Sequence, residues 1–334
     1  MTNILQERLQ TQTVLLADGA MGTNLFELGL VTGDNPELWN IDHPDRIINL
    51  HRSFIDAGAD IVLTNSFGGN APRLQLHQLQ DRVGELNEAA ARLAKQAVHA
   101  SGGHALVAGS MGPTGEIFEP VGSFSAAAGE AAFRDQAEAL ARGGADILWV
   151  ETMSSVEEVS AAVAAASTTG LPVVATMSFD TNGRTMMGLT PDAALNLAHH
   201  MPAPPAAFGA NCGIGPAQLV ATVMGFSRLR RTDDIIVAKG NCGVPEFKDG
   251  HIHYSGTVEV MVDYAKLAQD AGARIIGGCC GTTPAHVKAM ADVLRGRRQG
   301  PTPELSDVET QLGPITIVSD APETRRRSRR QRSN

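Results

Sequence analysis

Eight short strand-like apolar runs recur along the chain, and longer amphipathic stretches separate them. The runs are Val14–Gly19, Asp60–Phe67, Ala105–Gly112, Asp146–Met153, Pro172–Phe179, Ala206–Gly213, Asp234–Asn241 and Arg274–Gly281. The amphipathic stretches include Asp45–Ala57, Asp81–Ala100, Ala132–Arg142, Val156–Ser167 and Val258–Ala271. Regular alternation of strand and helix is typical of a parallel sheet, and eight such units predict an α/β protein with a (β/α)8 TIM barrel.

A weak internal repeat marks the points where helices would return to the sheet. Residues 56–61, 142–147 and 270–275 each combine a helix end, a glycine and the start of an apolar run two residues later. Glycine suits this position because a helix commonly ends on a residue with positive φ. The repeat therefore supports the barrel.

The repeating pattern stops near residue 298. Residues 300–321 are rich in Pro, Ser, Thr and acidic residues, and the last eleven residues carry six arginines. This composition predicts a barrel domain at 1–298 and a largely disordered Arg-rich tail at 299–334. The tail could bind RNA, an acidic partner or nothing, and a solvated tail is the reading that this composition favours.

Charge and hydropathy restrict the partners. The net charge of -9 argues against a nucleic-acid surface across the body of the protein. The first twelve residues are polar, and no apolar run reaches the roughly 18 residues that a bilayer requires, so we expect a cytoplasmic protein that does not enter a membrane. In a reducing compartment, cysteines are more often metal ligands or catalysts than disulfides.

All four cysteines fall where predicted strands end. Cys212 ends the sixth run, Cys242 follows the seventh, and Cys279 and Cys280 end the eighth. In a TIM barrel these ends form the active-site face, so Cys212, Cys279 and Cys280 predict a Zn²⁺ site with three sulfur ligands and an open fourth position. Cys242 is a weaker candidate. The alternative is buried, inert cysteine, which is common for this residue.

The adjacency of Cys279 and Cys280 imposes a condition on the backbone. Neighbouring residues of a regular strand point to opposite faces, so the chain must leave strand geometry if both sulfurs are to reach one metal. Gly277, Gly278 and Gly281 make such a departure possible.

Polar residues at other strand ends are candidates for substrate binding. Asp18 and Glu151, at the ends of the first and fourth runs, could accept hydrogen bonds from a substrate ammonium group. Gly19 and Ala20 could offer backbone N–H groups to a carboxylate, and Asn65 at the end of the second run joins the predicted set. Simple turn chemistry is the alternative for Asp18, since Asp-Gly is a strong turn signal.

Lys239 supports a rival function. A lysine near a strand end of this fold can form a Schiff base with a carbonyl substrate. The protein would then be an aldolase-like enzyme, and the cysteines would be structural.

The chain resembles the homocysteine S-methyltransferase family from about Val14 to Arg297. The motifs that carry the resemblance are LLADGAMGT, DIVLTNSFGGN, GPTGE, ETMSSVEE, GANCGIGP and GGCCGTTPAHV. The family includes betaine–homocysteine methyltransferases, S-methylmethionine-dependent enzymes and the homocysteine module of cobalamin-dependent methionine synthase.

The resemblance implies specific roles for residues of these motifs. It implies a TIM barrel whose catalytic zinc is held by Cys212, Cys279 and Cys280, with homocysteine bound by Asp18 and Glu151. Asn241, in the motif GNCGVP, looks like the asparagine of the synthase module that can occupy the zinc when substrate is absent.

The resemblance also implies the chemistry. Zinc would lower the pKa of the homocysteine thiol, and the thiolate would attack a methyl group to give methionine. The donor could be betaine or a similar small molecule, or methylcobalamin on a separate corrinoid protein. A betaine site would want an aromatic cage, but the betaine enzymes' tryptophan falls nearer Asn35 than Trp39, whereas TNSFGGN and GPTGE look closer to the synthase module.

Overall fold

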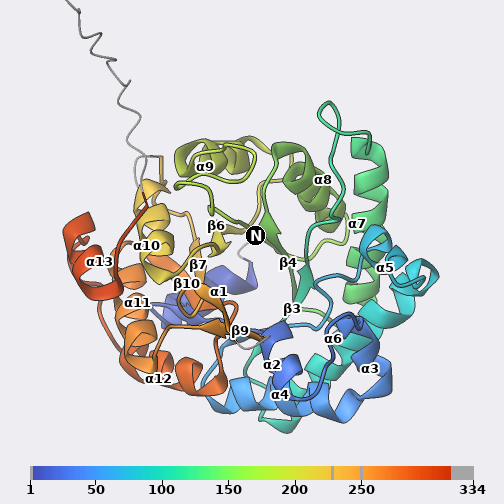
Figure 1. Ribbon diagram of the computed structural model, residues 1–334, viewed down its shortest axis with the longest axis horizontal. Coiled ribbons are helices and arrows are strands. Elements are labelled where there is room, and N and C mark those ends of the chain that lie inside the picture. Colours follow the sequence, from blue (N-terminus) through green and yellow to red (C-terminus); the bar gives the residue numbers. More distant parts are fainter. Residues whose placement is uncertain (1–2, 227–228, 249–250, 317–334) are drawn as a thin grey trace, which may run out of the picture.

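The computed structural model describes residues 3–226, 229–248 and 251–316, and its centre is a barrel of eight parallel strands (Figure 1). The barrel strands are β1 (Leu15–Leu16), β2 (Ile61–Leu63), β3 (Leu106–Met111), β4 (Ile147–Met153), β5 (Val173–Met177), β6 (Ala207–Cys212), β7 (Ile236–Gly240) and β10 (Ala273–Gly278). They are hydrogen-bonded in the order β1-β10-β7-β6-β5-β4-β3-β2, and a parallel bridge between Ala17 and Ile61 joins the first and last members. The predicted (β/α)8 TIM barrel is confirmed.

A ring of helices surrounds the strands (Figure 1). The barrel helices are α4 (Pro44–Asp56), α6 (Val83–Ala100), α7 (Ala126–Arg142), α8 (Val156–Ser167), α9 (Pro191–His200), α10 (Pro216–Gly225), α11 (Val258–Asp270) and α12 (Pro284–Leu294). Short helices fill the first two connections: α2 (Gly22–Glu27), η1 (Pro36–Leu38), α3 (Trp39–Asp42), α5 (Ala71–Gln75) and η2 (Gln80–Arg82). The repeat glycines Gly58, Gly144 and Gly272 follow helices and have φ of 105°, 99° and 103°, as the pattern predicts.

Serine or threonine side chains cap the N-termini of four barrel helices. Ser125, Ser155, Thr190 and Thr257 each precede a helix and accept a hydrogen bond from a backbone N–H in its first turn. Such caps satisfy donors that an isolated helix leaves unpaired, and each contributes about 1 kcal/mol. The strand-to-helix connections are therefore well defined on the face where the predicted site lies.

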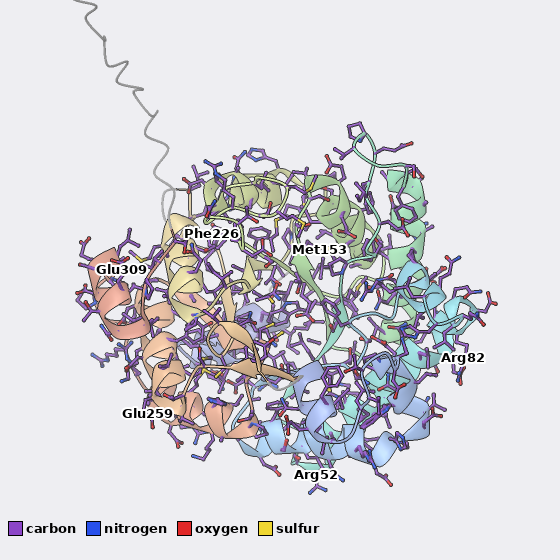
Figure 2. The ribbon with its side chains drawn as sticks, viewed as in Figure 1. Arg52, Arg82, Met153, Phe226, Glu259 and Glu309 are labelled. Atoms are coloured by element: carbon purple, nitrogen blue, oxygen red, sulfur yellow. The ribbon has the colours of Figure 1, made fainter. Side chains whose placement is uncertain are left out.

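The apolar side chains form two layers. Ile147 and Trp149 of β4 point into the barrel interior, whereas Leu148 and Val150 pack outward against the helices, as period-2 alternation requires. Figure 2 shows the outer boundary of the second layer: Arg52 and Glu259 project outward from the helix ring, whereas Met153 and Phe226 lie inside it.

Helix α1 (Ile4–Thr11) covers the end of the barrel where the strands begin. Its Leu5 is completely buried in the cluster of interior side chains, which includes Ile147 and Trp149. Arg274 donates hydrogen bonds to the carbonyl oxygens of Leu9 and Thr13 at the end of this helix, which fixes the helix to β10.

Two elements differ from the sequence-based expectation. An antiparallel hairpin, β8 (Pro245–Lys248) and β9 (His251–Tyr254), lies in the connection between β7 and α11 and was not predicted. Helix α13 (Leu305–Leu312) packs against α10 and α11 and buries Val308. The expectation of disorder from residue 299 onward is therefore wrong for this helix. The Arg-rich end lies outside the described residues.

No helix within the described residues is long and apolar enough to cross a membrane.

Candidate functional site

Three of the four cysteines meet at the end of the barrel where the strands finish. The Sγ atoms of Cys212, Cys279 and Cys280 all lie within 4.8 Å of one another. The strand order explains this meeting, because β6 and β10 are the two neighbours of β7. The three residues that sequence reasoning selected as metal ligands are thus brought together.

The backbone leaves strand geometry at Cys279, as the adjacency of the two cysteines requires. Strand β10 ends at Gly278, and the N–H of Thr282 then donates to the carbonyl of Cys279 at 3.1 Å, closing a turn. Gly281 has φ of 78° in this turn, and a Cβ there would lie 2.4 Å from Cγ of Tyr254. Glycine is therefore required both by conformation and by the close approach of Tyr254.

Asn241, directly after β7, lies between the turn that carries Cys212 and the turn that carries Cys279 and Cys280. Its Nδ2 donates to the carbonyl of Gly213 at 2.6 Å and lies 3.6 Å from Sγ of Cys212. Its Oδ1 accepts from the N–H of Cys280 at 3.0 Å. One amide side chain of the central strand thus holds both cysteine-bearing turns in place.

The thiols interact strongly with one another. Hydrogen bonds from Cys212 and Cys279 lower the pKa of the Cys280 thiol, whereas hydrogen bonds with Cys279 and Cys280 raise the pKa of Cys212. The cluster therefore favours a thiolate at Cys280. A set of sulfur ligands in this arrangement fits a thiophilic ion such as Zn²⁺.

Cys242 is not part of the cluster. Its Sγ lies 3.2 Å from the carbonyl oxygen of Gly256 and 3.3 Å from Nε2 of His286. His286 in turn contacts Thr283 through Nδ1, 2.8 Å from the hydroxyl oxygen. The fourth cysteine therefore joins a structural network behind the site.

Asp18 and Glu151 are two buried carboxyl groups of this site. Asp18 Oδ2 accepts a hydrogen bond from the N–H of Leu63 at 2.8 Å, but Oδ1 has no hydrogen-bond partner among the described residues. Glu151 Oε1 accepts from the hydroxyl of Ser110 at 2.5 Å. Burial raises the pKa of both groups to about 7, and the charge of Lys239 opposes the shift in each case.

Lys239 is the cation that these carboxyl groups share. Its Nζ lies 3.6 Å from Asp18 Oδ1 and donates to the carbonyl of Gly19 at 3.2 Å. Burial alone would lower the pKa of Lys239, but the charges of Asp18, Cys279 and Glu151 outweigh it and raise the pKa. A Schiff-base lysine needs a neutral amine, so these surroundings disfavour the aldolase-like alternative.

The remaining predicted substrate residues have protein contacts. Asn65 is buried, and its Nδ2 donates to the carbonyl of Pro36 at 2.8 Å, which ties two loops together. The N–H of Ala20 donates to the carbonyl of Thr282 at 3.1 Å. A Cβ on Gly19 would lie 2.7 Å from the same carbonyl oxygen, so only glycine fits between β1 and the turn after β10.

Sequence reasoning missed several residues of the site. Ser110 contacts Glu151, Asn211 contacts Thr152 and Cys279, and Tyr254 hydrogen-bonds Cys280. Ser110 and Asn211 sit at strand ends of the active-site face, a signal that could have singled them out. Tyr254 belongs to the unpredicted hairpin.

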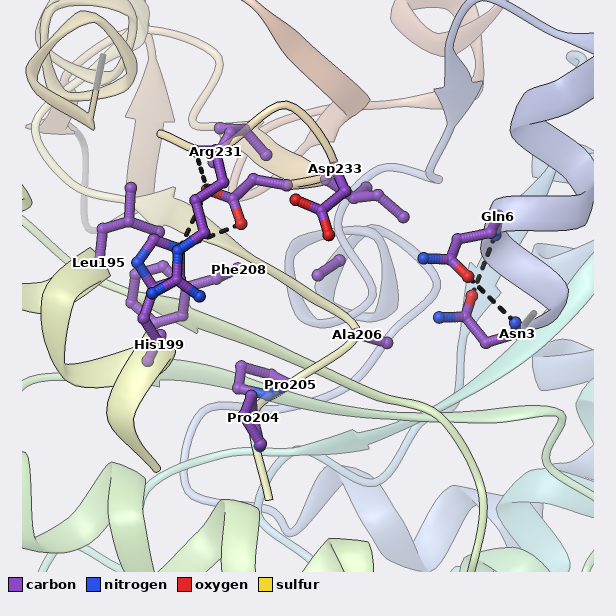
Figure 3. Close-up of a pocket in the computed structure, with 15 residues that line it drawn as sticks. Asn3, Gln6, Leu195, His199, Pro204, Pro205, Ala206, Phe208, Arg231 and Asp233 are labelled. Carbon is purple, nitrogen blue, oxygen red and sulfur yellow. Dashed lines mark hydrogen bonds and ion pairs between the residues drawn. The ribbon is translucent and has the colours of Figure 1, made fainter. Parts of the chain in front are cut away.

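A separate pocket lies at the opposite end of the barrel, where β6 and β7 begin (Figure 3). Asn3 and Gln6 of α1 line one side, and His199 and Asp234 line the other. The His199 ring nitrogen Nε2 is 3.0 Å from both carboxylate oxygens of Asp234, which also accepts from the N–H of Arg231. These polar groups are paired with one another, and no predicted site residue lines the pocket.

Comparison with known proteins decides the family. The model of the family described as homocysteine S-methyltransferase matches residues 15–294. The chain belongs to the homocysteine S-methyltransferase family. Its fold is that of a family of methyltransferases, and the resemblance inferred from the sequence motifs is confirmed.

Two groups of relatives support the homocysteine S-methyltransferase assignment. The structure is similar to the metallated form of the homocysteine methyltransferase MmuM from Escherichia coli, with a TM-score of 0.72 and 28% identity over 87% of this chain and 99% of that chain. The oxidized form of MmuM has a TM-score of 0.72 and 29% identity. The methionine synthase of Mycobacterium tuberculosis is 31% identical over 309 residues, 86% of this chain but 26% of the relative. The chain thus spans about a quarter of that synthase.

Proposed function

We propose that this chain transfers a methyl group to the sulfur of homocysteine and that Cys212, Cys279 and Cys280 hold Zn²⁺ in the active protein. The observation that carries the proposal is the mutual approach of the three Sγ atoms within 4.8 Å, on the face where Asp18 and Glu151 lie buried. A thiol-binding centre and an ammonium-binding centre on one face suit a substrate that carries both groups.

The ligand set supports zinc. Three cysteine sulfurs leave one position of a tetrahedral ion for a further ligand. When bound, Zn²⁺ would act as a Lewis acid and lower the pKa of the homocysteine thiol. The relative MmuM has been described in a metallated form, which supports a metal-bound form of this chain as well.

The carboxyl groups support recognition of the amino-acid end of homocysteine. Asp18 Oδ1 is a buried acceptor without a hydrogen-bond partner among the described residues, which suits an ammonium donor. Two carboxylates face the single cation Lys239, so a substrate ammonium would balance the remaining negative charge. For the substrate carboxylate we retain the N–H of Gly19 and set aside that of Ala20, which already donates to Thr282.

We further propose that the methyl donor is a methylated corrinoid carried by another protein domain. Apart from Leu229 and Leu305, every large apolar side chain that is exposed among the described residues lies between a barrel strand and its following barrel helix. That distribution concentrates apolar surface on the face of the site, as a docking surface would. Val121, Met186 and Val244, from three different connections, are 72%, 70% and 52% exposed.

The position of Trp39 argues against betaine. Its ring is 6% exposed, contacts the ring of His43 and lies under the guanidinium of Arg46 at 5.0 Å. That face of the indole is therefore already occupied by a cation of the protein.

Metal analysis tests the central proposal. Protein purified without chelators should contain about one zinc per chain, and Cys279→Ala should contain less than half of that, because one of three ligands is lost. Full homocysteine methylation by the Cys279→Ala variant would contradict the proposal. Trapping of a carbonyl substrate on Lys239 by borohydride would instead favour the Schiff-base alternative.

A direct comparison of donors tests the finer proposal. Homocysteine should be offered with betaine, with S-methylmethionine and with free methylcobalamin, and methionine should be measured. We expect methylcobalamin to give methionine. Methionine formed with betaine but not with methylcobalamin would reject the corrinoid donor. A reducing, cytoplasmic setting is part of the same proposal, because the four cysteines are free thiols and the ligands must stay reduced.

A further inference from the structure

Strand β4 carries an irregularity beside Glu151. Val150 pairs with Ala175 and Met153 pairs with Met177, so β4 contains one more residue than β5 between the two pairs. Within this bulge Thr152 has φ of 64°, a conformation that β-branched residues rarely adopt. Bulges of this kind redirect neighbouring side chains, and the neighbour here is the carboxyl group of Glu151.

A second unusual backbone conformation lies two strands away. Cys212, at the end of β6, has φ of 62°. Costly conformations persist only where the surroundings hold them in place, and they concentrate at functional positions. Here they occur beside one carboxyl group and at one sulfur of the proposed centre.

Asn211 connects the two. Its Oδ1 accepts from the N–H of Thr152 at 2.8 Å, and its Nδ2 donates to the hydroxyl oxygen of Thr152 at 2.7 Å. The same Nδ2 lies 3.9 Å from Sγ of Cys279, within reach of a weak hydrogen bond to sulfur. Asn211 is completely buried, so water cannot replace these contacts without rearrangement.

We propose that Asn211 is a positioning residue that couples the homocysteine-binding carboxyl group of Glu151 to the cysteine cluster. It fixes the bulge that aims Glu151, it precedes Cys212 directly, and it contacts Cys279. The inference rests on the proposed function, since it assigns Asn211 a part in placing homocysteine relative to the metal. No other described side chain is recorded in hydrogen bonds to both Thr152 and a cysteine of the cluster.

Three variants isolate this role. Thr152→Val keeps the shape and the branched Cβ but removes the hydroxyl that Asn211 contacts. Thr152→Ser keeps the hydroxyl and serves as the matched control. Asn211→Ala removes all three contacts at once.

The measurements are zinc affinity of the metal-free protein by competition with a chelator, homocysteine affinity of the zinc-loaded protein by calorimetry, and thermal unfolding. We expect Asn211→Ala to weaken zinc binding roughly 10- to 100-fold, as loss of a contact behind a metal ligand commonly does. Thr152→Val should weaken homocysteine binding about tenfold and zinc binding less, and Thr152→Ser should stay within about twofold of the unaltered protein. The double variant Asn211→Ala/Thr152→Val should match Asn211→Ala, because Thr152→Val removes a contact that Asn211→Ala has already removed.

A purely structural role gives a different result. If Asn211→Ala and Thr152→Val lower the unfolding temperature but leave both affinities within twofold, the positioning role is wrong. The zinc measurement keeps this inference separate from the proposed function. Should the unaltered chain bind zinc but not homocysteine, the proposed function fails, and the zinc affinity of Asn211→Ala still confirms or overturns the link to Cys279.

Discussion

The ammonium of Lys239 lies 3.6 Å from the carboxylate of Asp18, and both side chains are almost completely buried. The lysine also holds the carbonyl of Gly19, so one cation orders the end of β1 beneath the proposed site. Burial raises the pKa of Asp18 and Glu151, and the positive charge of Lys239 opposes this rise in both groups. Lys239 therefore helps to keep these carboxyl groups ionised where a substrate ammonium would bind.

Substitution of Lys239 should reveal this dependence. Lys239→Met leaves two buried carboxyl groups without a cation, and we expect a loss of about 3 kcal/mol in the free energy of unfolding, as for other broken buried pairs. Homocysteine should bind more weakly at neutral pH because Asp18 and Glu151 would both be protonated more readily. The comparison is Lys95→Met, which breaks a half-exposed pair with Asp146 and should cost no more than about 1 kcal/mol. Equal losses in the two variants would contradict the prediction.

Glu151→Gln should make the protein more stable above pH 7 and weaken its binding of homocysteine. Burial raises the pKa of Glu151 from 4.5 to about 7, so the folded metal-free protein binds a proton that the unfolded chain has already released. The contribution of Glu151 to stability should therefore be lost as the pH rises from about 4.5 to about 7, and the variant should lack this part of the pH dependence, a difference of about 3 kcal/mol above pH 7, whereas the part from Asp18 remains. Its KM for homocysteine should rise. Denaturant unfolding between pH 4 and 8, with the exposed Glu116→Gln as control, measures the effect.

His51 should make the protein sensitive to acid. Its ring is completely buried in α4, neither nitrogen has a partner among the described residues, and burial lowers its pKa to about 4. The unfolded chain binds a proton below about pH 6.5 that the folded protein excludes until about pH 4. The contribution of His51 to the unfolding free energy should thus be full above pH 6.5, and about 3 kcal/mol of it should be lost as the pH drops towards 4, opposite in sign to the contributions of Asp18 and Glu151.

His51→Leu should remove this contribution to the pH dependence, whereas substitution of the exposed His77 by Gln should leave the pH dependence unchanged. Unfolding free energies at pH 4.5 and 7.5 suffice. An identical slope in His51→Leu and in the unaltered protein would show that another group causes the acid sensitivity.

Gly281 should tolerate no side chain. Gly281→Ala places Cβ 2.4 Å from Cγ of Tyr254 at φ of 78°, so we expect both backbone strain and displacement of the cysteine turn. Gly296→Ala is the matched control, because Gly296 has a similar φ of 72° but no atom within 4 Å of the added Cβ. The control should lose about 1 kcal/mol, and Gly281→Ala should lose more and also retain less zinc. Full zinc retention in Gly281→Ala would show that the ligands do not depend on this turn.

The fold could be predicted because its signals are local and repeated. Eight apolar runs, five amphipathic stretches and three repeats of a glycine after a helix each favour the same architecture. The meeting of Cys212 with Cys279 and Cys280 followed from the barrel, since the ends of β6 and β10 lie on either side of β7.

The missed features depend on contacts between distant segments. Nothing near Asn211 in the sequence indicates that its amide faces Thr152, because that pairing arises from a bulge in β4, two strands away in the barrel and 59 residues away in the sequence. Helix α13 was missed because it has only eight residues and lies in a stretch rich in Pro, Ser, Thr and acidic residues, and it packs against α10 and α11. Local composition cannot report such tertiary stabilisation.

Helix α1 closes one end of the barrel. Because Leu5 is completely buried in the interior cluster at the end where the strands begin, the substrates of the proposed reaction would have to reach the cysteine cluster through the opposite end. If a protein-bound methyl donor docks over that mouth, as proposed, homocysteine would have to enter before it docks and methionine would have to leave after it departs. A donor domain docked there would also shield the proposed site from solvent.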